Sequence, residues 1–175
     1  MCFIADYTAR EANIVSTSQS SPLEGHHQLY PASNLLNGKG LNGKFGGDNC
    51  VATNYGPTQW VSFELEAPEK LSSIQITPRL DCCPERSQNF HVSIGPSKSY
   101  DPNEPLCLPV ISKLVLQEGL TEYKCTGKLH EGKYVKITRG VDGSDGLIDI
   151  CEVKIFTVGG NRMLLGEIIL GLGQL

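Results

Sequence analysis

The residues of this chain that are best equipped for chemistry lie together in the segment "RLDCCPER", residues 79 to 86. Two arginines, an aspartate, a glutamate and two adjacent cysteines share these eight positions. Such a cluster could form a redox centre, a metal site or a ligand-binding edge. A charge cluster alone is most often a solvated strand end with weak salt bridges, so the paired cysteines carry the information.

Cys82 and Cys83 predict an unusual local structure. Neighbouring Cα atoms lie about 3.8 Å apart, below the usual disulfide range that begins near about 4.4 Å, so a bond between them closes a small strained ring. Strain of this kind tends to accompany function. The ring would place a compact, polarizable sulfur surface beside the guanidinium groups of Arg79 and Arg86. A redox role would favour a C-x-x-C pair, which the chain lacks.

The overall composition limits the class of protein. Seven cysteines in 175 residues, without paired C-x-x-C units, indicate disulfides and therefore a secreted, extracellular protein. A net charge of −4 without a basic run argues against a nucleic-acid partner. No apolar stretch is long enough to predict insertion into a membrane, and "MCFIA" is too short for the core of a signal peptide. We therefore expect a mature, soluble protein.

The elements that must position this cluster are predicted to be strands. Apolar residues alternate with polar ones in short segments separated by Gly, Pro, Asn and Asp, and no segment between them predicts an amphipathic helix. The apolar positions are Val61, Phe63 and Leu65; Ile74 and Ile76; Val92 and Ile94; Leu114 and Leu116; Val135 and Ile137; Val153 and Ile155. This pattern favours an all-β sandwich or jelly roll.

The tail after Gly160 has a different pattern. Its apolar residues fit either one face of a helix or an extended arm, and either would need a partner surface. They are Leu164, Leu165, Ile168, Ile169 and Leu172.

The cluster resembles the F-type lectin family, whose signature is Arg-x-Asp, four residues, then Arg or Lys, commonly with paired cysteines between. Arg79, Asp81 and Arg86 match this spacing. Five further segments resemble family motifs in family order: "NIVSTSQSS", "ASNLLNGK", "QWVSFEL", "EGKYVKI" and "DICEVKIF". The resemblance divides the chain into an N-terminal arm (1–13), an F-type lectin domain (14–158) and an apolar C-terminal tail (159–175).

The resemblance implies an eight-stranded jelly-roll β-sandwich and a lectin that binds sugars on cell-surface glycans. The arginines would donate to sugar oxygens, Asp81 would hold both guanidinium groups, and the ring of Cys82 and Cys83 would contact an apolar sugar face. Arginine suits this role because its donors are rigid and always charged. In the family, the loops that carry Leu23, His27 and Phe45 line a pocket for a methyl group. His27 could instead be an ordinary surface residue.

One position departs from the family pattern. The third sugar-contacting residue of the family is a histidine, and Ala52 occupies its position here, in "CVATN". Alanine can neither donate nor accept a hydrogen bond, so discrimination for fucose should be lost. We expect N-acetylated amino sugars, N-acetylglucosamine or N-acetylgalactosamine, as ligands. The alternatives are fucose binding with compensating loops, and a protein-binding module like the discoidin domains.

The resemblance also implies a structural calcium ion. Its ligands would be Asn34, Asn37, Asn49 and Glu152, with carbonyls near Lys39 and at Cys151. Oxygen ligands suit this hard cation, but Asn37 replaces the usual aspartate and should weaken its binding. Alternatively, these asparagines cap turns without a metal.

The family pattern pairs the cysteines as Cys50 with Cys151, Cys107 with Cys125, and Cys82 with Cys83. Cys2 would then have no partner within the chain. This leftover cysteine and the apolar tail together indicate a disulfide-linked dimer that agglutinates cells. The alternative is a free thiol on a frayed terminus.

The four histidines and scattered carboxylates match no nucleophile–base or metalloprotease pattern, so we do not expect an enzyme.

Overall fold

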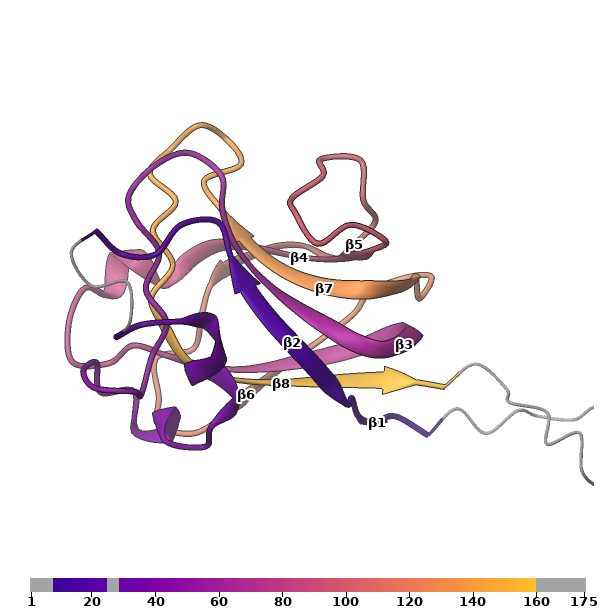
Figure 1. The fold of residues 1–175 in the computed structure, drawn as a ribbon, viewed down its shortest axis with the longest axis horizontal. Helices are drawn as coiled ribbons and strands as arrows, with labels where there is room; N and C mark the ends of the chain where they lie inside the picture. Colours follow the sequence, from indigo (N-terminus) through magenta and orange to yellow (C-terminus); the bar gives the residue numbers. More distant parts are fainter. Residues whose placement is uncertain (1–7, 25–28, 160–175) are drawn as a thin grey trace, which may run out of the picture.

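The computed structural model describes residues 8–24 and 29–159 (Figure 1). These residues form eight strands and three short 3₁₀ helices, which confirms the all-β expectation. The strands are β1 (Arg10–Glu11), β2 (Ile14–Gln19), β3 (Gln59–Pro78), β4 (Gln88–Gly95), β5 (Leu106–Lys113), β6 (Thr121–Lys124), β7 (Glu131–Arg139) and β8 (Ile150–Val158). The 3₁₀ helices are η1 (Ala32–Leu36), η2 (Gly40–Asn42) and η3 (Pro84–Arg86).

β3 joins the two layers of the sandwich. Its first half pairs with β2 and β7, and its second half pairs with β8 and β6, all antiparallel. β4 and β5 extend the layer of β7, and β1 extends the layer of β8. β1 lies within the segment expected to be an N-terminal arm. A single 20-residue strand therefore replaces the two separate strands expected at 61–65 and 74–76.

The core lies between the two layers and is built from the alternating apolar residues. Phe63 on the first half of β3 and Ile76 on its second half are both fully buried in one cluster with Val135 and Val153. Removing such side chains from water is the main force that stabilises the fold. The alternation along the chain therefore does identify the inward faces of these strands.

The expectation of a strand at residues 114–116 was wrong. β5 ends at Lys113, and the backbone N–H of Leu114 donates to the carbonyl of Ser87 in a loop. Leu114 is buried, but Leu116 is exposed. Two apolar residues with one position between them matched the pattern of a strand although the chain had already left the sheet. β5 was not predicted because Leu106 and Val110 are apolar although they are exposed. The segment therefore lacks the alternation of apolar and polar residues that marks the other strands.

The three disulfides occur with the expected pairing: Cys50–Cys151, Cys82–Cys83 and Cys107–Cys125. The first joins the loop before β3 to β8, and the last joins β5 to the chain that follows β6. Both therefore link segments that are distant in sequence. Cys2 and the tail from residue 160 lie outside the described residues.

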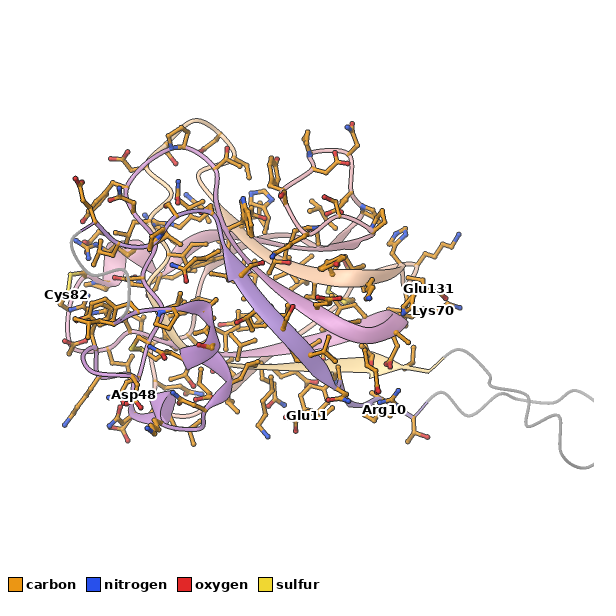
Figure 2. The ribbon with its side chains drawn as sticks, viewed as in Figure 1. Arg10, Glu11, Asp48, Lys70, Cys82 and Glu131 are labelled. Atoms are coloured by element: carbon orange, nitrogen blue, oxygen red, sulfur yellow. A yellow bond between two sulfur atoms is a disulfide. The ribbon has the colours of Figure 1, made fainter. Side chains whose placement is uncertain are left out.

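The loops that carry the predicted site gather at one end of the sandwich. Figure 2 places Cys82 at this end and Lys70 and Glu131 at the other. Thr157 near the end of β8 pairs with Arg10 of β1, so both ends of the described fold lie side by side. Figure 2 places Arg10 away from Cys82. Within the described ranges, no helix has the length and apolar character needed to cross a membrane.

Candidate functional site

Arg79 follows the end of β3 and is held on two sides. Its Nε donates to Oδ1 of Asp81 at 2.9 Å, and its Nη2 donates to Oδ2 at 3.4 Å. The Cζ atom also lies 3.9 Å from the centroid of the Phe45 ring, a cation–π distance. The backbone N–H of Phe45 donates to the same carboxylate at 3.1 Å. The hydrogen bond from Arg79 lowers the pKa of Asp81, so this carboxylate stays charged beside the guanidinium group.

The vicinal disulfide forms the turn between the two arginines. Cys83 adopts a left-handed backbone conformation with φ 60° and ψ 50°, and η3 begins directly after it. The backbone N–H of Arg86 donates to the carbonyl of Cys83 at 2.9 Å. This tight turn brings Arg86 back toward Arg79, so both guanidinium groups lie at one end of the molecule.

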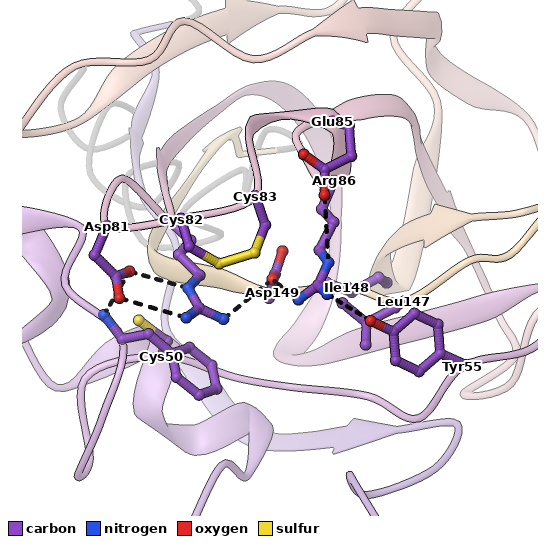
Figure 3. Close-up of polar contacts among 12 residues, drawn as sticks. Cys50, Tyr55, Asp81, Cys82, Cys83, Glu85, Arg86, Leu147, Ile148 and Asp149 are labelled. Carbon is purple, nitrogen blue, oxygen red and sulfur yellow. Dashed lines mark hydrogen bonds and ion pairs between the residues drawn. A yellow bond between two sulfur atoms is a disulfide. The ribbon is translucent and has the colours of Figure 1, made fainter.

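Arg86 is held by residues that sequence reasoning did not select. Its Nη1 lies 3.3 Å from Oδ2 of Asp149, and its Nη2 donates to the hydroxyl of Tyr55 at 2.5 Å (Figure 3). The expectation that Asp81 holds both guanidinium groups was therefore wrong for Arg86. Asp81 lies beside Arg79, whereas η3 directs Arg86 toward the start of β8, where Asp149 lies.

Asp149 is a buried carboxylate shared by both arginines. Its side chain is 2% exposed, and its Oδ2 also lies 3.5 Å from Nη1 of Arg79. Burial raises its pKa to about 6, while Arg86, Arg79 and Arg139 act in the opposite direction. The sequence did contain a signal, because "LIDI" places one carboxylate inside an apolar run, and a buried charge needs a partner.

Arg139 at the end of β7 ties the two loops of the site together. Its Nε and Nη2 donate to the carbonyls of Gln88 and Glu85, at 3.0 and 3.2 Å. Its Nη1 donates to the carbonyl of Leu147 at 2.6 Å. Burial lowers the pKa of this arginine, but each of its three nitrogens donates to a carbonyl. The loop of Arg86 is thereby fixed relative to the loop of Asp149.

Aromatic rings form one side of the site. Phe45, whose ring lies against the guanidinium group of Arg79, also stacks on Tyr30, with the two ring centroids 4.4 Å apart. Leu23, expected in the same pocket, is partly buried, and His27 lies outside the described residues. Ala52 is 2% exposed, and its backbone N–H donates to the carbonyl of Tyr30.

The expected calcium ligands surround η2 and the start of β8. Both oxygens of Glu152, which is 3% exposed, accept backbone N–H groups, from Gly38 and Gly40, at 3.3 Å. A Cβ atom on Gly40 would lie 1.8 Å from the carbonyl of Cys151 and 2.5 Å from that of Asn49. Only glycine allows this approach, so a buried carboxylate and two carbonyls converge here. Burial raises the pKa of Glu152.

The asparagines of this set make local hydrogen bonds. The amide of Asn34 donates to the carbonyls of Leu29 and Cys50, and that of Asn37 donates to the carbonyl of Asp48. The side-chain oxygen of Asn37 accepts from the backbone N–H of Lys39, and Asn49 donates to the carbonyl of Lys44. Among the described residues, no three His, Cys, Asp or Glu side chains form a metal-binding group. A cation here would depend on Glu152 together with carbonyl and amide oxygens, a donor set that suits calcium.

The jelly roll and its loop-borne arginines define the class of protein, a β-sandwich of the galactose-binding type. The family model described as the NedA-like, galactose-binding domain matches residues 39–137. Fucolectin-4 of Anguilla japonica is 31% identical over 140 residues, which cover 79% of this chain and 74% of the fucolectin. The chain therefore belongs to the F-type lectin family.

Two other similar proteins are longer than this chain. The structure of an F-lectin from the serum of striped bass, Morone saxatilis, superposes with a TM-score of 0.69 at 27% identity, covering 85% of this chain and 49% of that one. The pentraxin fusion protein of Xenopus laevis is 28% identical over 129 residues, which cover 74% of this chain and 30% of that protein. The chain thus spans half or less of each.

Proposed function

We propose that this protein is a secreted lectin that binds terminal sugars of cell-surface glycans through Arg79 and Arg86. The observation that carries this proposal is the fixed pair of guanidinium groups at the loop end of the sandwich, both in contact with Asp149. Rigid donors held before the ligand arrives reduce the entropy lost on binding. The three disulfides support an oxidising, extracellular location.

The preferred ligands in this proposal are N-acetylglucosamine and N-acetylgalactosamine. Ala52 removes the imidazole that the family uses for fucose, whereas an acetamido carbonyl remains a good acceptor for the arginines. The stacked rings of Phe45 and Tyr30 offer an apolar surface for the acetyl methyl group.

Tyr55 favours a second candidate, fucose. Tyr55 is 53% exposed, and its hydroxyl accepts a hydrogen bond from Arg86. A hydroxyl at this place could supply a polar contact that Ala52 does not.

A glycan array with competition by free sugars tests the proposal. We expect binding to glycans with terminal N-acetylated amino sugars, and stronger inhibition by free N-acetylglucosamine or N-acetylgalactosamine than by L-fucose. Stronger inhibition by fucose would select the second candidate. A protein that binds no glycan but captures protein ligands would instead be a discoidin-like binding module.

Calcium belongs to this proposal as a structural ion. Glu152 with the carbonyls of Cys151 and Asn49 would hold it, and Asn37 and Asn34 would complete the set by turning their amide oxygens inward. The ion would stabilise the loops beneath the arginines. Because Glu152 is the single carboxylate among these ligands, the affinity should be modest.

A further inference from the structure

Asp149 reaches both arginines because of the register between β3 and β8. This antiparallel pair aligns Pro78 with Ile150, so the next positions outward along the two strands are Arg79 and Asp149. The disulfide of Cys151 anchors the start of β8 to the loop before β3. The position of this carboxylate is therefore set by the sheet and by a covalent bond.

One oxygen of Asp149 contacts both guanidinium groups. Its Oδ2 lies 3.5 Å from Nη1 of Arg79 and 3.3 Å from Nη1 of Arg86. Two guanidinium cations this close to one point repel each other, and the attraction of each to the carboxylate between them outweighs that repulsion. Asp149 thus holds the two donors at a set separation.

The same contacts determine how much positive charge the site offers. Asp81 faces Nε and Nη2 of Arg79, and Asp149 faces its Nη1. Every nitrogen of Arg79 therefore lies against a carboxylate. On Arg86, Nη1 faces Asp149 and Nη2 faces a neutral hydroxyl, that of Tyr55. Its Nε lies 3.8 Å from Oε1 of Glu85, whose side chain is exposed.

With Glu85 and Arg139 included, three carboxylates (Asp81, Asp149, Glu85) lie among three arginines (Arg79, Arg86, Arg139). The carboxylates thus offset the positive charge of the site, so an anionic ligand would be repelled by them as well as attracted by the arginines. A neutral hydroxyl or acetamido oxygen can still accept from the guanidinium N–H bonds that these contacts do not use, because each terminal nitrogen carries two donors. Like charges brought together in a partly desolvated site oppose binding strongly.

We propose that Asp149 is a positioning and specificity-determining residue, which fixes the two arginines relative to each other and restricts the site to uncharged sugars. This inference rests on the proposed sugar-binding function. It assigns the discrimination between neutral and anionic sugars to a buried residue that need not touch the ligand. Uronic acids, sialic acids and sulfated sugars should therefore be excluded.

The test compares wild type with Asp149→Asn at neutral pH, by titration calorimetry with matched sugars. The pairs are N-acetylglucosamine with its 6-sulfate, and galactose with galacturonic acid. We expect wild type to prefer the neutral member of each pair, and Asp149→Asn to narrow that preference by about tenfold or more, because a negative charge behind the two arginines has been removed. Asp149→Glu restores the charge and should restore the preference for neutral sugars.

The matched control is Asp145→Asn, which removes an exposed carboxylate from the same loop and should leave both the affinity and the preference unchanged. Circular dichroism shows whether each variant is folded. If Asp149→Asn does not fold, the inference is tested on wild type and Asp149→Glu alone. The inference is overturned if these two proteins bind anionic sugars as tightly as neutral ones.

A folded Asp149→Asn protein that keeps the wild-type preference would also overturn the role of Asp149 and leave sugar binding intact. A wild-type protein that binds no sugar on the array would overturn both the inference and the proposed function.

Discussion

Arg79 and Arg86 are separated by a turn of six residues, yet their side chains converge on Asp149. Each guanidinium group also has a second partner, Asp81 for Arg79 and Tyr55 for Arg86. The donors are therefore held before any ligand binds, and the remaining N–H bonds are the ones a sugar can use.

At this scale, Arg79→Ala or Arg86→Ala should reduce sugar affinity by about 100-fold or more, because each change removes charge-assisted hydrogen bonds to the ligand. Both proteins should remain folded by circular dichroism. Arg10→Ala is the control, since Arg10 pairs with Glu69 at the opposite end of the sandwich. Retention of wild-type affinity in both site variants, measured by calorimetry, would refute the assignment of the site.

Ala52→His should increase the affinity for L-fucose by about tenfold, the value of one additional hydrogen bond. Ala52→Leu is the control for size, because Ala52 is buried and either replacement must displace its neighbours. Competition with free fucose measures the effect. If the leucine variant gains as much as the histidine variant, or if neither gains, the loss of the imidazole does not explain the specificity.

At the scale of the elements, the loops of the site are built on the ends of β3, β7 and β8. β3 ends at Pro78, directly before Arg79, and β7 ends at Arg139, which donates to the carbonyls of Glu85 and Leu147 in the two neighbouring loops. The sheet therefore positions the loops, and Arg139 fixes them to each other.

The two long-range disulfides should differ in their contribution to stability. The Cys50–Cys151 bond closes a loop with a sequence separation of 101, and Cys107–Cys125 closes one of 18. In the chain-entropy model, replacing the first pair by alanine costs about 4 to 5 kcal/mol and replacing the second about 3 kcal/mol. Urea unfolding of the two double variants measures both values, and a larger loss for the shorter loop would contradict the expected order.

Calcium should stabilise the protein when it is added after treatment with a chelator. A ligand present at about 100 times its Kd stabilises the folded state by about 2.7 kcal/mol, which thermal unfolding detects as a rise in Tm. Glu152→Gln should abolish this rise, whereas Asp48→Asn, in the exposed loop nearby, should keep it. A Tm that does not respond to calcium in the wild-type protein would exclude the ion.

At the scale of the whole molecule, the ends of the described fold lie opposite the candidate site (Figure 2). Two copies joined near this end of the described fold would therefore keep both sites open. Tethering two weak sites can increase avidity by about 10² to 10⁴, which suits a protein that binds cell surfaces.

We predict a dimer linked through Cys2 that agglutinates glycan-bearing cells. Non-reducing electrophoresis should show a dimer that Cys2→Ser abolishes, and agglutination should weaken with it. Light scattering distinguishes a covalent dimer from a non-covalent one. A Cys2→Ser protein that stays dimeric would show that contacts other than the Cys2 disulfide join the two copies. A wild-type protein that is monomeric at all concentrations would refute the prediction of a dimer.

The features that the sequence alone determined are those that depend on near neighbours. Alternation identified the inward faces of β3, β7 and β8, because residues two apart in a strand always share a face. The contact of Arg79 with Asp81 and the ring of Cys82 and Cys83 could also be predicted, because each joins residues at most two positions apart in the sequence. The long-range disulfide pairing came from the family resemblance and was confirmed.

The partners of Arg86 depend on how distant parts of the chain fold together. Asp149 and Tyr55 lie 63 and 31 positions from it in sequence, so their approach depends on the register of β8 against β3 and on the path of two loops. The alternation of apolar residues does not encode register between distant strands, and it cannot distinguish Leu114, in a loop, from a residue of the sheet. A buried charge in an apolar run indicates that a partner exists, but folding determines which partner it is.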